Sequence, residues 1–193
     1  MDSFVLVGGN RIHYIEEGQG NKALLLFHGA NFNARTWVEV GTVAAAASNG
    51  FRVISVDFPG YGQSQGERRD LSKFVGDFIK ALGWVKEPVL LGASMGARAL
   101  LEYALSVSGK GIKALILVGP VGLAENAERL DLLSGLKVLA IWGSEDNISP
   151  TSNAKFLQRI GASVEIIEKA PHACYMKEPQ KFNEIVVKFL RSL

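Results

Sequence analysis

Gly92-Ala93-Ser94-Met95-Gly96 separates an apolar run, residues 88–91, from a helix-like stretch, residues 97–107. A serine on a sharp turn from a strand into a helix is held in a strained backbone conformation, which lifts its hydroxyl clear of the sheet. Glycines two residues before and after it are needed because the strand and the helix approach too closely there for side chains. The pentapeptide therefore predicts a strand, a tight turn that presents Ser94, and a helix.

Short apolar runs alternate with helical patterns on both sides of this unit. The runs are residues 23–27, 52–56, 88–91, 113–118, 137–142 and 163–167, and the helical stretches are residues 36–47, 71–82, 97–107, 151–159 and 179–190. Before them, residues 4–7 and 11–15 flank Gly8-Gly9-Asn10, which predicts a β-hairpin. Apolar runs without polar alternation are typical of parallel strands covered by helices. We expect one α/β domain, residues 1–193, with a mainly parallel sheet, an N-terminal antiparallel hairpin and helices on both faces.

Composition narrows the functional classes. The 193 residues are 48% hydrophobic and 21% charged, with a net charge of only +2, so nucleic acid and anionic membranes are not expected partners. No leader-like segment or membrane-length apolar run occurs, which favours a cytoplasmic protein. The one cysteine, Cys174, can form no internal disulfide and offers no metal-ligand spacing. We expect neither a metal nor a cofactor, and no protein partner is indicated.

Polar residues follow the apolar runs at the positions where a parallel sheet binds ligands, the carboxyl ends of its strands. His28 follows the first run, Asp57 the second, Ser94 the third, Asp146 the fifth and His172 the sixth. A serine, an acid and a histidine are therefore expected along one edge of the sheet.

A serine hydroxyl needs a base within hydrogen-bond reach, and the base needs a partner that holds its tautomer. Of the three histidines, His13 lies in the opening hairpin and His28 precedes the serine, so His172 is the expected base. Asp146 follows a strand and lies between Ser94 and His172, in the chain order expected for this serine motif. Glu145 is the alternative acid.

With these motifs in order, the chain resembles the α/β-hydrolase fold family over almost its whole length. The motifs are His28-Gly29, residues 57–64, the serine pentapeptide, residues 143–146, and the loop of His172 followed by Glu178-Pro179. The resemblance implies Ser94 as nucleophile, His172 as general base and acid, Asp146 as its orienting partner, and an oxyanion hole formed by the backbone N–H groups of Ala30 and Met95. It also implies a hydrolase that needs no cofactor.

The sequence departs from many relatives in ways that remove no functional atom. Ala93, Ala97 and Pro171 stand where relatives often have histidine, glycine and glycine. Residues 119–136 leave room for one short helix where many relatives insert a lid domain. An open site buries little of a large substrate, so we expect a preference for small or accessible acyl groups. The expected pocket residues are Asn31, Phe32, Trp37, Phe58, Ile148 and Met176.

Structural alternatives exist for several of these residues. Ser94 could be an ordinary turn serine, Asp146 could cap the helix near residue 151 or close a turn, and His172 could be a surface histidine. His28 is expected to shape the oxyanion loop and Asp57 to fix its own Pro-Gly turn. Cys174 is expected to be a small buried apolar group.

The functional hypothesis is a serine hydrolase that cleaves carboxylic esters through an acyl-enzyme. A non-catalytic protein that binds a ligand or partner on the same fold is an alternative, because fold and motif do not fix function. A cofactor-free peroxidase or C–C bond hydrolase that uses the same residues is another.

Overall fold

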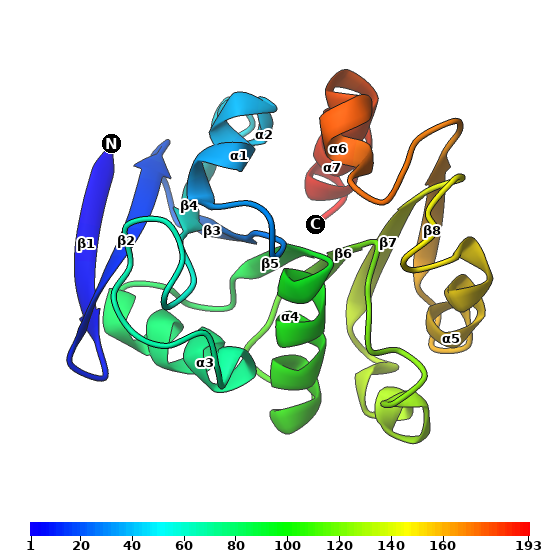
Figure 1. Ribbon diagram of the computed structural model, residues 1–193, viewed down its shortest axis with the longest axis horizontal. Coiled ribbons are helices and arrows are strands. Elements are labelled where there is room, and N and C mark those ends of the chain that lie inside the picture. The colour runs from blue at the N-terminus through cyan, green and yellow to red at the C-terminus, as the bar shows by residue number, and fades with distance from the viewer.

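The computed structural model describes residues 1–193, and all eight strands form one sheet (Figure 1). The strands are β1 (Asp2–Val7), β2 (Asn10–Glu17), β3 (Lys22–Phe27), β4 (Phe51–Val56), β5 (Val89–Ala93), β6 (Ala114–Val118), β7 (Lys137–Gly143) and β8 (Ser163–Ile167). Their order is β1-β2-β4-β3-β5-β6-β7-β8. The β1–β2 and β2–β4 pairs are antiparallel and every other pair is parallel, which confirms the predicted sheet and hairpin.

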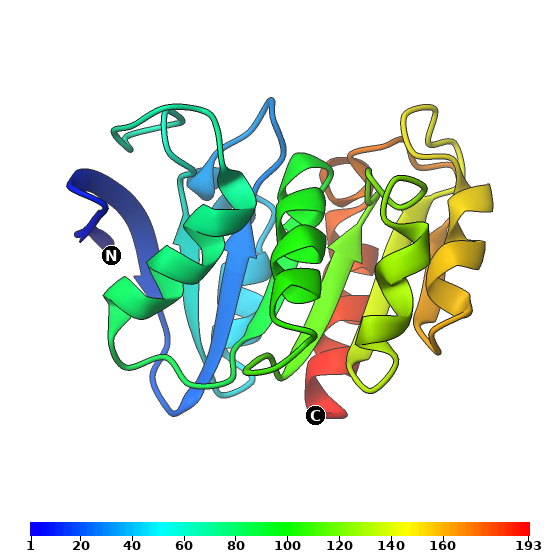
Figure 2. The same cartoon turned by 90° about the horizontal axis from the view of Figure 1, so that it is seen from below.

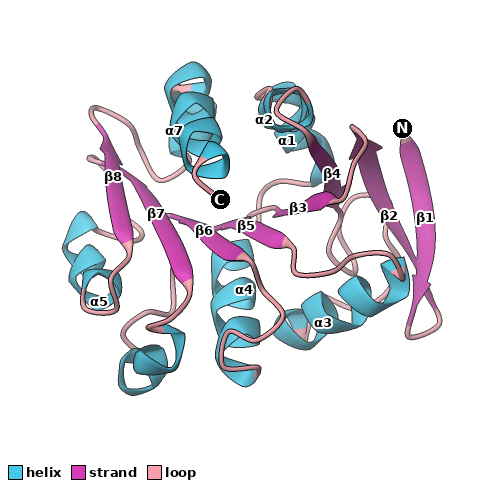
Figure 3. Cartoon of the chain, turned by 180° about the vertical axis from the view of Figure 1, so that it is seen from behind, coloured by secondary structure: helices cyan, strands magenta, loops and turns pink.

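Helices connect the strands and cover both faces of the sheet. They are α1 (Ala34–Glu39), α2 (Thr42–Ala47), α3 (Leu71–Leu82), α4 (Met95–Ser106), α5 (Ala154–Gln158), α6 (Cys174–Lys177) and α7 (Pro179–Arg191), with 3-10 turns η1 (Ala127–Leu133) and η2 (Thr151–Asn153). Figure 2 looks onto the face covered by α3, α4, η1 and α5, and Figure 3 shows α1, α2 and α7 on the opposite face.

The five central strands, β3 to β7, are buried on both faces, which explains their continuous apolar sequences. Their side chains form part of two apolar cores, one on each face of the sheet. On one face α3 contributes Phe74 and Phe78, and on the other α7 contributes Phe182 and Val186. This packing holds the carboxyl ends of the parallel strands in fixed positions along one edge of the sheet.

Four elements differ from the sequence-based expectation. The predicted helix 36–47 is two helices, because Gly41 adopts φ +83° between α1 and α2. The helix predicted over residues 151–159 opens as the 3-10 turn η2, and α6 was not predicted. Strand β8 alternates exposed and half-buried residues because it lies at the edge of the sheet.

The connection between β6 and β7 contains only η1, so no lid domain lies over the carboxyl edge. No helix in the structure has the length and apolar character needed to cross a membrane.

Candidate functional site

Ser94 lies at the turn between β5 and α4 with φ +52° and ψ −110°, a conformation that non-glycine residues rarely adopt. A Cβ atom added to Gly92 would come within 2.7 Å of the Gly96 carbonyl oxygen, and one added to Gly96 within 2.5 Å of the Phe27 carbonyl oxygen. The N–H of Ser94 donates to the Val118 carbonyl at 2.9 Å, which fixes the turn to β6. The two glycines are therefore required by close packing, as the sequence indicates.

The structure brings Ser94, His172 and Asp146 together. The distance from Ser94 Oγ to His172 Nε2 is 2.8 Å, and His172 Nδ1 lies 2.7 Å from Asp146 Oδ2. An ionised carboxylate only accepts hydrogen bonds, so Nδ1 carries the proton and Nε2 can accept the serine proton. The Asp146 side chain is fully buried, whereas that of His172 is 18% exposed. The arrangement can activate a hydroxyl that substrate can reach from solvent.

Asp146 is held by its own loop as well as by His172. Its Oδ1 accepts hydrogen bonds from the backbone N–H groups of Ile148 at 2.9 Å and Ser149 at 2.8 Å. It therefore closes a turn and also orients the histidine, and it does not cap a helix. Glu145 makes no contact of this kind with His172.

Ser149 and Gly119 support the site, and the sequence analysis missed both. The buried Ser149 hydroxyl donates to the Pro120 carbonyl at 2.6 Å and accepts from Trp142 Nε1 at 3.2 Å, which joins the Asp146 loop to the end of β6. A Cβ atom on Gly119 would lie 3.1 Å from both His172 Nδ1 and Asp146 Oδ2. For Gly119 the sequence does offer a signal, because a glycine directly after a predicted strand indicates a close approach of another segment.

The oxyanion hole predicted from the sequence consists of the backbone N–H groups of Ala30 and Met95. Met95 is the first residue of α4, where N–H groups have no acceptor within the helix. The N–H of Ala30 donates to no other group of the protein. A Cβ atom on Gly29, the preceding residue, would lie 3.7 Å from the Ser94 Cβ, so this loop lies directly beside the serine.

His28 has a structural role beside this loop. Its Nδ1 donates to the Gly29 carbonyl at 2.7 Å, and its Nε2 accepts from the N–H of Phe58 at 3.1 Å. Burial lowers the pKa of His28 below its ordinary value. The ring is therefore neutral and joins the Gly29 loop to the end of β4.

Asp57 fixes more than its own turn. Its Oδ2 accepts from the N–H of Gln63 at 2.9 Å and from His13 Nδ1 at 2.7 Å, and its Oδ1 accepts from the N–H of Ala34 at 2.7 Å. One buried carboxylate thus holds the start of α1, strand β2 and the following loop in place.

A cavity of about 180 Å³ opens over the three residues. Ten residues line it: Gly29, Ala30, Asn31, Phe32, Ala93, Ser94, Val118, Ile148, His172 and Tyr175. Three of the expected pocket residues, Asn31, Phe32 and Ile148, are among them. Val118 and Tyr175 were not expected, because a strand end and a short helix carry no pocket signal in sequence.

The other three expected pocket residues lie elsewhere, and that prediction was wrong. Phe58 is fully buried against Phe27 and His28, and Trp37, on α1, is fully buried against Tyr175 and Phe182. Met176 is 44% exposed on α6, outside the cavity. Aromatic residues next to a site serve the core more often than the pocket.

Cys174 is buried two residues after His172, and burial raises the pKa of its thiol to about 12. It is therefore a neutral apolar side chain, as expected, and not a second nucleophile.

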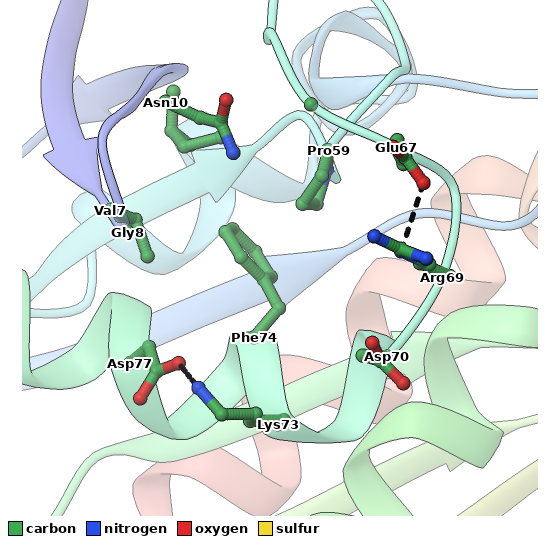
Figure 4. A pocket seen from close by; sticks show the side chains of 12 residues that line it. Val7, Gly8, Asn10, Pro59, Glu67, Arg69, Asp70, Lys73, Phe74 and Asp77 are labelled. Atoms are coloured by element: carbon green, nitrogen blue, oxygen red, sulfur yellow. Dashed lines mark hydrogen bonds and ion pairs between the residues drawn. The ribbon is translucent and has the colours of Figure 1, made fainter.

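The largest cavity, about 570 Å³, lies away from these residues, between the β1–β2 hairpin and the start of α3 (Figure 4). Four of its five charged side chains pair with each other: Glu67 with Arg69 at 2.9 Å, and Asp77 with Lys73. No serine, histidine or cysteine lines it, so the smaller cavity is the candidate active site. No group of three or more His, Cys, Asp or Glu residues is placed to hold a metal ion.

Known proteins resemble the chain in both sequence and structure. "Protein ABHD14A" of Danio rerio is 31% identical over 176 residues, which cover 88% of this chain and 64% of that protein, so the chain spans less than two thirds of its length. The human "Putative protein-lysine deacylase ABHD14B" is 28% identical over 185 residues, with 91% and 86% covered.

The crystal structure of a predicted CIB-like hydrolase from Thermoplasma acidophilum superposes with a TM-score of 0.92 at 29% identity and covers 100% of this chain and 98% of that one. The model of the alpha/beta hydrolase family matches residues 24–139, more than half of the sequence. The match runs from β3 through β4, β5, the serine turn and β6 to the start of β7. The chain therefore belongs to the alpha/beta hydrolase family.

Proposed function

We propose that this protein is a serine hydrolase that cleaves small or accessible carboxylic esters through an acyl-enzyme intermediate. The observation that carries the proposal is the hydrogen-bonded series from Ser94 through His172 to Asp146, with distances of 2.8 Å and 2.7 Å. A serine that donates to an oriented imidazole is the arrangement that nucleophilic catalysis requires.

In the first half of the proposed reaction, Ser94 Oγ attacks the ester carbonyl carbon while its proton moves to His172 Nε2. The carbonyl oxygen becomes an oxyanion that accepts from the N–H groups of Ala30 and Met95, each worth about 2.7–4 kcal/mol of transition-state stabilisation. His172 then returns the proton to the departing alcohol oxygen, and the acyl group remains on Ser94. Asp146 stays ionised and stabilises the imidazolium.

In the second half, His172 takes a proton from a water molecule, whose oxygen attacks the acyl carbon. Collapse of the intermediate breaks the bond to Ser94 Oγ, which recovers the proton from His172. The balance is one ester and one water converted to one acid and one alcohol.

The dimensions of the site favour a small acyl group. The cavity over Ser94 measures about 180 Å³, and no lid extends it. Ile148, at the cavity wall, is 66% exposed, so the opening faces solvent directly. A short acyl group on a large carrier can therefore reach the serine.

This accessibility supports a second candidate, hydrolysis of an acyl amide on a lysine side chain. The human relative's name gives protein-lysine deacylase, and the chain covers 86% of that relative. The same residues would act, with His172 protonating an amine in place of an alcohol.

A panel of short-chain esters, thioesters and acyl-lysine peptides, run with the wild-type protein and Ser94→Ala, tests the proposal. We expect turnover of at least one class, and loss of at least about 10³-fold of it in Ser94→Ala with folding retained. Circular dichroism checks the folding. Equal turnover in the variant would contradict the role of Ser94, and no turnover of any class would favour the non-catalytic binding protein.

A further inference from the structure

A second cavity, of about 330 Å³, lies beside the one that contains Ser94. Asn31 and Phe32 line both cavities and form their common wall. The second cavity is lined by His13, Asn31, Phe32, Asn33, Arg35, Thr36, Glu39, Asp57, Gly62 and Gln63. Phe32 is the only hydrophobic member, so the second cavity suits a polar group, whereas the first is mostly apolar.

The base of the second cavity is rigid. His13 and Asp57 are each only 2% exposed, and Asp57 accepts hydrogen bonds from His13 and from the N–H groups of Ala34 and Gln63. The N–H of His13 also donates to Ser64 Oγ at 2.9 Å. Strand β2, the start of α1 and the loop of Gln63 are thus all hydrogen-bonded to the Asp57 carboxylate. Such a preformed polar cavity is typical of a binding site.

Carboxylates and basic side chains pair around this base. His13 Nδ1 faces Asp57 Oδ2 at 2.7 Å and its Nε2 faces Asp2 Oδ1 at 2.8 Å. Both ring nitrogens of His13 therefore lie within hydrogen-bond distance of a carboxylate oxygen. The hydrogen bond from His13 lowers the pKa of Asp2, which is therefore ionised, and Arg35 pairs with the same oxygen at 2.9 Å. Two basic side chains, His13 and Arg35, face two carboxylates, Asp2 and Asp57.

The carboxylate of Glu39 is not paired with a basic side chain. It lines the cavity from the last turn of α1, and no ion pair or side-chain hydrogen bond involves it. With Asp2 included, three carboxylates lie around the cavity against two basic side chains, so negative charge is in excess. The aromatic ring of Phe32 in the shared wall adds a surface that attracts cations.

We propose that this second cavity is a substrate subsite that binds a positively charged, ammonium-bearing end of the substrate while the scissile carbonyl lies at Ser94. The proposal rests on the proposed function, since it places the reacting carbonyl at the serine. Glu39 is the specificity-determining charge and Phe32 the aromatic wall. Neither residue touches the reacting atoms.

Two matched substrate pairs test the subsite, one for each side of the scissile bond. The first pair is acetylthiocholine and its neutral isostere, in which a tert-butyl group replaces the trimethylammonium group. The second pair is the p-nitrophenyl esters of γ-trimethylammoniobutyrate and of its tert-butyl isostere. In each pair the ratio of kcat/KM for the cationic substrate to that for the neutral one is measured in wild type, Glu39→Gln, Glu39→Lys and Glu128→Gln.

In at least one pair, we expect the wild-type ratio to exceed one and to fall about two- to five-fold in Glu39→Gln, the range of exposed charge interactions. Glu39→Lys should lower it further, and added salt should reduce the wild-type ratio. Glu128, an exposed glutamate on η1 that lines neither cavity, is the matched control, and its substitution should leave the ratio unchanged.

A ratio that is independent of Glu39 in both pairs, with Ser94-dependent turnover present, would overturn the subsite and leave the proposed function intact. Absence of Ser94-dependent turnover of all four substrates, together with no labelling of Ser94 by a fluorophosphonate, would remove the proposed function and the subsite with it.

Discussion

At the scale of single residues, each polar side chain of the site is held from a different part of the chain. His172 depends on Asp146, and Asp146 depends on the N–H groups of Ile148 and Ser149. The Ser149 hydroxyl in turn bridges Trp142 and the Pro120 carbonyl. The position of the imidazole is thus set by residues that never touch substrate.

Ser149→Ala should weaken both stability and turnover. The substitution leaves the buried Trp142 Nε1–H and the Pro120 carbonyl without this partner, which costs about 1–3 kcal/mol of unfolding free energy. Loosening of the Asp146 loop should lower kcat more than it changes KM, whereas Ser149→Thr, which keeps the hydroxyl, should recover most of both. Urea unfolding and ester kinetics measure the effects, and an unchanged kcat in a destabilised Ser149→Ala would show that the bridge has only a structural role.

His28 should make the protein less stable as the pH falls. Its folded pKa is held below the ordinary value of 6.5 by burial, so above pH 6.5 both the folded and the unfolded chain are neutral at this residue and the stabilisation is complete. Below that pH the unfolded chain takes up a proton that the folded chain refuses, and stability is lost as the pH falls through the folded pKa, at up to about 1.4 kcal/mol per pH unit.

Urea unfolding between pH 7.5 and 5.5 should therefore show a steeper loss for the wild type than for His28→Gln, which keeps a donor and an acceptor without titrating. The other histidines are the same in both proteins and cancel in the comparison. Parallel slopes for the two proteins would contradict the assignment.

At the scale of elements, the start of α4 packs closely against the end of β3. Gly96 packs against the Phe27 and His28 carbonyl groups at the end of β3, and both are backbone atoms that cannot move aside as a side chain can. The serine turn is therefore rigid because three elements meet there without room for a Cβ atom.

Gly96→Ala should destabilise the protein by about 1–3 kcal/mol and reduce turnover, because the turn must shift away from β3. Gly135→Ala is the matched control: no atom lies within 4 Å of its added Cβ, and its φ is not positive. That change should be neutral or stabilise by up to about 1 kcal/mol. Equal effects of the two substitutions would show that the close contact is not the constraint.

The same elements show what sequence reasoning could and could not predict. The apolar runs of β3 to β7 and the serine pentapeptide are local patterns, so the sheet and the position of Ser94 followed from sequence. The break at Gly41 depends on one left-handed residue, and α6, from Cys174 to Lys177, is too short to show a helical period. Ser149, Gly119 and the true cavity walls act through contacts between distant segments, which no local pattern records.

At the scale of the whole molecule, the carboxyl edge of the sheet carries both cavities, and no domain covers them. The apolar cavity that contains Ser94 is small, and the polar cavity beside it carries an excess negative charge. Specificity is therefore expected to come from the size of the acyl group and from charge next to it, since no lid encloses the substrate.

A series of p-nitrophenyl esters of increasing acyl length should show kcat/KM highest for the shortest chains and falling once the acyl group outgrows the cavity. Each added methylene group should change the activation free energy by at most about 1–3 kcal/mol, because an open pocket excludes additional groups only weakly. Efficiency that rises steadily to long chains would contradict a small open site.

The most direct measurement of the central claim is the rate at which a fluorophosphonate probe modifies Ser94, followed by mass spectrometry of the intact protein and of its peptides. We expect one adduct, located on Ser94, absent in Ser94→Ala and formed at least about 100-fold more slowly in His172→Gln, because the imidazole is the base that activates the hydroxyl. An unmodified Ser94, or a rate that does not depend on His172, would contradict this claim.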